Sequence, residues 1–211
     1  MTEIAVISGG LREPSSTRLL ADRLAAGVRT TLEEHGKSVN SSTVELRPLG
    51  RSIMDATLSG FPSSDLENAF AIVAAADGVI AVTPAFNASF SGMFKMFFDV
   101  LPEGIFEDMP VLIGATGGTE RHSLVLEHAL RPMFSYLHAI VSPRGVYAAT
   151  EDFGSQAADA LGRRIAEASS DFARVIENCG TRQRRDPFTE DLSSMQRLLG
   201  SPGPRGGEEL E

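Results

Sequence analysis

Short hydrophobic runs alternate along this chain with longer segments of helical periodicity. Three runs, at residues 4–7, 78–84 and 110–116, are bounded by glycine, proline or polar residues. Runs of this length are typical of strands that are buried on both faces of a parallel sheet. Residues 39–46 instead alternate between apolar and polar side chains, which predicts another strand, and we expect a fifth within residues 139–148.

The segments between these strands predict helices. In the first segment, Leu20, Leu24 and Val28 recur at the spacing that places them on one helix face. Pro132 is expected to bend the fourth helix. Residues 48–64 are rich in serine, glycine and proline, and they predict a loop. The five helices are expected at residues 17–35, 66–76, 92–101, 120–137 and 152–178.

This alternation of strands and helices is typical of a doubly wound α/β fold with helices on both faces of a parallel sheet. With five strands we expect the flavodoxin-like order 2-1-3-4-5 and a three-layer sandwich. Residues 1–179 would form this domain, and residues 180–211 a C-terminal extension that is partly disordered. An apolar pattern near residues 192–199 suits either a short helix docked on a neighbouring subunit or a loosely attached tail.

The composition narrows the classes of partner. The formal net charge of −9 repels phosphate backbones and anionic lipid, so we expect neither nucleic acid nor a membrane. The single cysteine, Cys179, cannot form an internal disulfide. We see no leader pattern at the N-terminus and no apolar run near the roughly 20 residues that span a bilayer, so a cytoplasmic protein is expected. Histidines lack cysteine or carboxylate partners at ligand spacing, so no metal site is expected.

Ligands of open α/β sheets bind outside the carboxyl ends of the strands, where three unusual loops fall. The first loop offers two glycines, Arg12 and the hydroxyls of Ser15, Ser16 and Thr17 at a helix start. Free N–H groups of a helix N-terminus bind anions, and arginine adds charge-assisted hydrogen bonds. The loop lacks Gly-Lys-Ser/Thr and Gly-x-Gly-x-x-Gly sequences, so a monophosphate fits better than a triphosphate or pyrophosphate. Helix capping by Ser15 or Ser16 is the simpler interpretation.

The second loop suits a flat ring with polar edges. Pro84, Ala85, Phe86 and Asn87 lie at the end of the third strand. The aromatic side chain can supply apolar contact, while backbone N–H groups and the amide can meet ring carbonyls and nitrogens. A turn with Asn87 in an Asx motif is the simpler interpretation of this loop alone.

The third loop follows the fourth strand and contains Thr116, Gly117 and Gly118. Paired glycines let the backbone approach a planar ring closely. A helix start capped by Thr119 would also explain this sequence. The joint placement of all three loops at one edge favours a single binding site over three unrelated turns.

Taken together, the sequences of these three loops resemble the NAD(P)H-dependent FMN reductase family. The first loop resembles that family's Gly-Ser-x-Arg-x-x-Ser-x-Thr signature, and the third resembles its glycine-containing flavin loop. The second resembles its Pro-x-Tyr-Asn-x-Ser sequence with a following glycine and lysine. The matching residues of this second motif are Pro84, Phe86, Asn87, Ser89, Gly92 and Lys95. The resemblance covers about residues 1–178 and is greatest to reductases that supply luciferase-like monooxygenases.

Two positions depart from the family pattern. Gly10 stands where the family has serine, so one phosphate hydroxyl is absent and Ser16 or backbone would substitute. Phe86 stands where the family has tyrosine, which keeps the ring and loses its hydroxyl. We expect flavin binding to survive both changes.

The resemblance implies FMN as cofactor and NAD(P)H as hydride donor, with transfer from nicotinamide C4 to flavin N5. The cofactor supplies that chemistry, so we nominate no catalytic side chain. It also implies a homodimer or homotetramer and a flavin-dependent monooxygenase as a partner. The aromatic stripe of helix 92–101 would be mostly core, with a possible role at a subunit interface. The implied FMN-binding residues are Arg12, Ser15, Ser16, Thr17, Pro84, Ala85, Phe86, Asn87, Thr116, Gly117 and Gly118.

Three other functions are compatible with the same motifs. One is a quinone, azo-dye or metal-oxyanion reductase that keeps its FMN bound. Another is a flavodoxin-type electron carrier without NAD(P)H activity, and the third is a flavin-free signalling or scaffold module. The sequence leaves the choice between NADH and NADPH open.

Overall fold

A parallel sheet forms the centre of the structure, a computed structural model that describes residues 1–154 and 158–180. The strand order is β2-β1-β3-β5-β6, and β7 also pairs in parallel with β5. The predicted order 2-1-3-4-5 is therefore confirmed, with the fifth position divided between two short strands. A further short strand, β4, pairs antiparallel with β3. The strands are β1 Thr2–Ser8, β2 Val39–Glu45, β3 Gly78–Phe86, β4 Ser89–Phe90, β5 Pro110–Gly117, β6 Ile140–Val141 and β7 Val146–Ala149.

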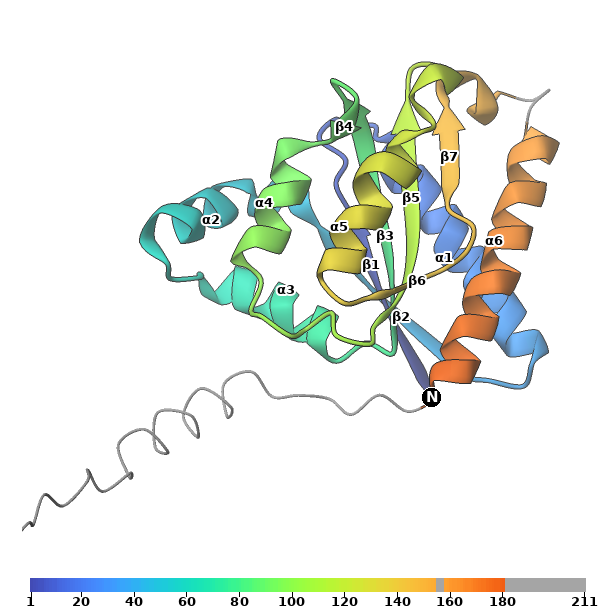
Figure 1. Cartoon of the computed structure of the whole chain (residues 1–211), viewed down its shortest axis with the longest axis horizontal. Helices are drawn as coiled ribbons and strands as arrows, with labels where there is room; N and C mark the ends of the chain where they lie inside the picture. Colours follow the sequence, from blue (N-terminus) through green and yellow to red (C-terminus); the bar gives the residue numbers. More distant parts are fainter. Residues whose placement is uncertain (155–157, 181–211) are drawn as a thin grey trace, which may run out of the picture.

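Helices cover both faces of the sheet, which gives three layers (Figure 1). Successive residues of a strand point to opposite faces, so Ile4 and Val6 pack beneath α1 and α6, while Ala5 and Ile7 face the other helical layer. The opposite layer contains α2, α3, α4 and α5. The helices are α1 Ser16–Glu34, α2 Leu46–Ser59, α3 Ser64–Ala74, α4 Gly92–Val100, α5 Arg131–Tyr136 and α6 Ala158–Cys179.

The predicted loop at residues 48–64 is wrong for most of its length. Helix α2 occupies Leu46–Ser59 and ends at Gly60, which adopts the left-handed conformation with φ of 79°. Proline is tolerated in the first turn of a helix, and Pro48 stands there. Ile53 is fully buried and gives the helix its inward face. Tertiary packing thus overrides a loop-like composition.

The fourth predicted helix, residues 120–137, is interrupted. It consists of a 3-10 turn at Glu120–His122, a π-helical turn at Leu126–Leu130 and then α5. Pro132 stands in the first turn of α5, which follows the π-helical turn directly, and the predicted bend there stays a prediction. The predictions for residues 181–211, including the apolar pattern at 192–199, lie outside the described residues.

Aromatic rings fill the core between α4 and α5. The ring of Phe98 lies 4.8 Å from that of Phe94, 5.4 Å from Phe97 and from Phe106, and 5.2 Å from Phe134, measured between centroids. These separations suit tilted and edge-to-face contacts. The core role of the stripe is confirmed for these α4 rings, and its role at a subunit interface stays a prediction.

Replacing Phe98 with alanine should lower the free energy of unfolding by about 3–5 kcal/mol, because a cavity remains where four rings met. Urea unfolding followed by circular dichroism measures this change. Phe61→Ala is the matched control, since that ring is 79% exposed. It should change stability by no more than about 0.5 kcal/mol. A Phe98→Ala effect as small as the control would contradict the packing described.

Candidate functional site

A cavity of about 730 Å³ opens at the carboxyl ends of the strands, between the three loops. Its volume lies within the range typical of small-molecule sites. Every predicted FMN-binding residue except Asn87 lines it. These lining residues are Arg12, Ser15, Ser16, Thr17, Pro84, Ala85, Phe86, Thr116, Gly117 and Gly118.

Among the described residues, sequence reasoning missed five that line the cavity. Leu11 and Pro14 belong to the first loop, and Leu19 lies one turn along α1. Thr150 and Phe153 follow β7, in a 3-10 turn. The last two could have been found from the sequence, because the end of the fifth strand shares this edge of the sheet.

The start of α1 leaves donors open to the cavity. Ser15 is the N-cap, and its Oγ accepts a hydrogen bond of 3.1 Å from the Arg18 amide, so the capping interpretation holds for Ser15. The first helical hydrogen bond runs from Leu19 N–H to the Ser15 carbonyl. The amides of Ser16 and Thr17 consequently have no acceptor among the described residues.

Two arginines near this helix start differ in their availability. Arg18 is paired with Asp22 at 2.8 Å and also with Glu45, and the hydrogen bond to Asp22 chiefly raises the pKa of Arg18. Arg12 is exposed, and within the described residues no carboxylate pairs with it. Among the described residues, Arg12 is thus a cation without a carboxylate partner beside the open amides.

The position of the Ser15 side chain explains why glycine stands at position 10. A Cβ atom at this position would lie 2.1 Å from Ser15 Oγ, which is far inside a van der Waals contact. The family's serine could not stand here without displacing the N-cap. This departure therefore follows from the way the chain caps α1.

A buried hydrogen bond links the first loop to the third. The hydroxyls of Thr17 and Thr116 lie 2.8 Å apart, and both residues are buried. Either hydroxyl can be the donor of this hydrogen bond, so the predicted contact of Thr17 with a phosphate stays a prediction. The two loops are thereby held at a fixed separation.

Thr116→Val should lower the free energy of unfolding of the flavin-free protein by about 1–3 kcal/mol, because the Thr17 hydroxyl loses its buried partner. The double variant with Thr17→Val should recover most of that loss, since neither side then leaves a polar atom unpaired. Chemical denaturation of the two single variants and the double variant measures this coupling. Strictly additive losses would show that the hydrogen bond is unimportant.

Close packing shapes the third loop. A Cβ atom at Gly117 would lie 2.1 Å from the Tyr147 hydroxyl oxygen, which itself donates a hydrogen bond of 2.7 Å to the Thr119 carbonyl. Burial, and then the Asp152 carboxylate, raise the pKa of Tyr147. The phenol therefore stays protonated and remains a donor beneath the loop.

The second loop is the tip of a hairpin. β3 continues through Pro84 to Phe86 and turns into β4, so the predicted strand end at Pro84 is wrong. Asn87 and Ala88 have φ of 47° and 66°, and His128 Nε2 lies 2.7 Å from the Ala88 carbonyl oxygen. Asn87 is exposed at this turn and does not line the cavity, which favours the simpler turn interpretation for its side chain.

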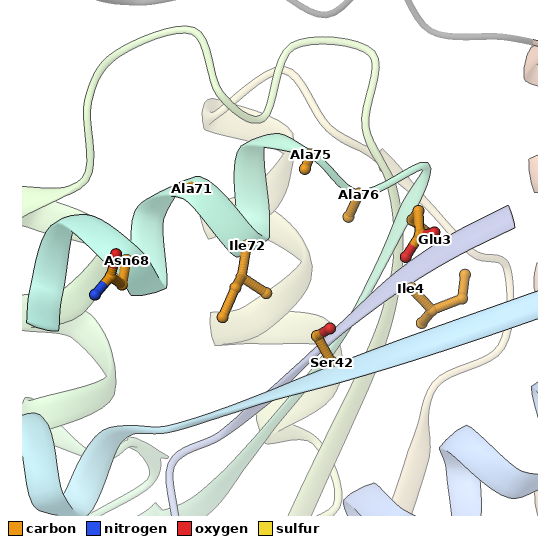
Figure 2. Close-up of a pocket in the computed structure, with 8 residues that line it drawn as sticks. All are labelled: Glu3, Ile4, Ser42, Asn68, Ala71, Ile72, Ala75 and Ala76. Carbon is orange, nitrogen blue, oxygen red and sulfur yellow. The ribbon is translucent and has the colours of Figure 1, made fainter.

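A second hollow, of about 480 Å³, lies against α3, β1 and β2 (Figure 2). Its wall is mostly alanine and isoleucine. The Glu3 carboxylate there accepts a hydrogen bond of 2.8 Å from Asn40. This hollow therefore offers little free polar chemistry. No cluster of three metal-ligating side chains occurs within residues 1–154 and 158–180.

Residues 2–154 match the sequence profile of the NADPH-dependent FMN reductase family. The chain belongs to this family. It is therefore an NAD(P)H:FMN oxidoreductase whose redox partners are FMN and a nicotinamide nucleotide, as the sequence predicted. None of the described helices has the length and apolar character needed to cross a membrane.

Relatives of this FMN reductase are similar over most of the chain. An FMN reductase (NADPH) of Pseudomonas aeruginosa is 34% identical over 151 residues, which cover 72% of this chain and 78% of that protein. The NADH-dependent FMN reductase SfnE of Pseudomonas putida is 37% identical, with 69% and 75% covered. The structure of an oxidoreductase from Corynebacterium diphtheriae superposes with a TM-score of 0.81 at 43% identity, and the match covers 84% and 98% of the two chains.

Proposed function

We propose that this reductase binds FMN in the 730 Å³ cavity, with the phosphate at the start of α1 and the flavin ring toward the second and third loops. The observation that carries the proposal is the donor set at one end of the cavity. It combines the amides of Ser16 and Thr17 with the guanidinium of Arg12, for which residues 1–154 and 158–180 provide no acceptor or carboxylate partner. A helix N-terminus with an adjacent arginine suits a phosphate dianion.

The rest of the lining fits a flat, largely apolar ring. Phe86 is 44% exposed at the cavity and supplies aromatic surface. Gly118 lines the cavity, and no atom of the described residues lies within 4 Å of where its Cβ would be. Backbone N–H groups at such a glycine loop can approach ring carbonyls without a side chain between them.

When bound, FMN would supply the chemistry of hydride transfer from the nicotinamide nucleotide. The chain's own residues would bind FMN and orient its ring. Arg12 is the one ionisable side chain that the described residues contribute to the cavity wall, and it suits an anion and not proton transfer. The Thr17–Thr116 hydrogen bond fixes the spacing between the phosphate end and the ring end.

We further propose that reduced FMN leaves this enzyme and serves a flavin-dependent monooxygenase. The partly open cavity, with a half-exposed Phe86 in its wall, supports exchange of the flavin. A homodimer or homotetramer is supported by exposed apolar side chains such as Leu58 and Tyr136, which are 79% and 84% exposed. Light scattering coupled to size exclusion tests the oligomeric state.

The reductase proposal is tested by oxidation of NADH and of NADPH, with and without added FMN. Turnover should depend on added FMN, and the reduced flavin should support a flavin-dependent monooxygenase held behind a dialysis membrane. Turnover with quinones or dyes but not with free FMN would favour the reductase with permanently bound FMN. FMN binding without oxidation of either nucleotide would favour an electron carrier.

A further inference from the structure

The outer edge of β2 has no strand beside it in the part of the chain that the structure describes. β2 stands at the end of the sheet and pairs with β1 in unbroken register over its seven residues. Asn40, Ser41 and Thr43 are exposed along this strand. Proteins usually protect an edge strand with lysine, proline or a bulge, or they cover it with another segment. β2 has none of the first three, so its edge suits a covering segment.

The hollow of about 480 Å³ lies between β2 and α3, next to this edge (Figure 2). Ser42 and Glu3 line it from the sheet, and Ala71 and Ile72 line it from α3. Glu3 accepts its hydrogen bond from the neutral Asn40 amide, which leaves the negative charge of the carboxylate in place. The charged residues of β1, β2 and α3 are all acidic, namely Glu3, Glu45, Asp65 and Glu67. An apolar wall in acidic surroundings suits a basic segment with aliphatic stems.

Helix α6 ends beside the start of β2. His35 directly follows α1 and stands shortly before β2, and its Nδ1 lies 3.0 Å from Glu177 Oε1 in the last turn of α6. Figure 1 shows the end of α6 at the end of the molecule where β1 begins. Residues 181–211 follow Gly180 and lie outside the described residues. Six extended residues span roughly 20 Å, so a short stretch of them is long enough to follow most of β2.

We infer that residues 182–187 of the same chain lie along the open edge of β2, beside the hollow. Their three arginines can pack aliphatic stems on the apolar wall while a guanidinium pairs with Glu3. Pro187 has no N–H group, so it suits the outer side of an added edge strand. Two copies of the acidic β2 edge would repel each other, which favours this basic segment over the β2 edge of a second copy. The arginines are Arg182, Arg184 and Arg185.

A short bismaleimide cross-linker tests this placement in the full-length chain. Cys179→Ser removes the natural thiol, and Gln183→Cys with Ser41→Cys puts one thiol on each side of the proposed contact. These thiols should link within one chain at least about tenfold faster than those of Gln183→Cys with Tyr136→Cys, because docking raises their effective concentration. Tyr136 is the matched control, since it is exposed on α5, which leads to β6 at the other edge of the sheet. Equal rates, or a product with the mass of two chains, would overturn the inference.

Hydrogen exchange supplies a second test that needs no added cysteine. Replacing Arg182, Arg184 and Arg185 with glutamine should speed amide exchange in residues 39–45 about tenfold, because three exposed ion pairs together contribute roughly this factor. Replacing Arg197 and Arg205 with glutamine removes charge outside the proposed contact and should leave that exchange unchanged. If the triple variant exchanges like the unmodified chain, or both sets of substitutions speed exchange equally, the inference is wrong. Neither test uses FMN or NAD(P)H, so both outcomes are independent of the proposed function.

Discussion

Gly117→Ala should lower FMN-dependent oxidation of NAD(P)H by about a hundredfold, the loss expected when a binding loop shifts by about 1 Å. The added methyl group would stand 2.1 Å from the Tyr147 hydroxyl oxygen, so either the loop or the tyrosine must move. Movement of the tyrosine also breaks its hydrogen bond to Thr119. Steady-state turnover and quenching of FMN fluorescence measure the two consequences separately.

The cause of this loss can be isolated. Tyr147→Phe removes the hydroxyl that the methyl group meets, so the double variant with Gly117→Ala should recover part of the lost FMN binding. Recovery should be incomplete, because the ring carbon Cζ would still lie 3.2 Å from the new methyl group. Gly162→Ala on the exposed face of α6 is the matched control and should retain full turnover. Equal activity of Gly117→Ala and this control would refute the steric argument.

The strands were predictable because burial on both faces leaves a local signal in the sequence. The runs at residues 4–7 and 110–116 are strands in the structure, and the alternation with helices was sufficient to predict the strand order. Helix α2 was not predictable in this way. Its Gly50 looks like a loop residue, yet a Cβ there would lie 2.7 Å from the Met93 side chain of α4. The small residue serves helix packing, which no local pattern reveals.

The candidate site, like the fold, could be predicted from the sequence only in part. The loop motifs and the rule for strand ends were enough to predict that the three loops meet at one cavity. The contact between Thr17 and Thr116 joins residues 99 positions apart, so it depends on the finished fold. Asn87 belongs to the second motif but is exposed at the tip of a hairpin and is not among the residues that line the cavity, so its contact with FMN stays a prediction. Motifs thus located the cavity, whereas tertiary contacts decide which side chains face it.

Arg12→Ala should raise the KM for FMN between tenfold and about a hundredfold, because a hydrogen bond to a charged group contributes about 1.5–3 kcal/mol. The KM for riboflavin, which lacks the phosphate, should not change. Arg12 has no carboxylate partner within the described residues, so its removal breaks no ion pair there and the stability of the protein should be unaffected. Turnover with each flavin, measured at several salt concentrations, tests this expectation.

The experiment must distinguish the loss of one positive charge from the loss of a direct contact between Arg12 and the phosphate. Arg29→Ala removes the same charge from an exposed part of α1 that does not line the cavity, and it should leave the KM for FMN within twofold of the unmodified enzyme. Screening weakens a long-range effect of net charge at high salt, whereas a direct contact with the phosphate persists better. If both variants raise the KM equally and salt abolishes the difference, Arg12 acts only through the general field. If Arg12→Ala alone impairs FMN and spares riboflavin, the start of α1 is the phosphate site.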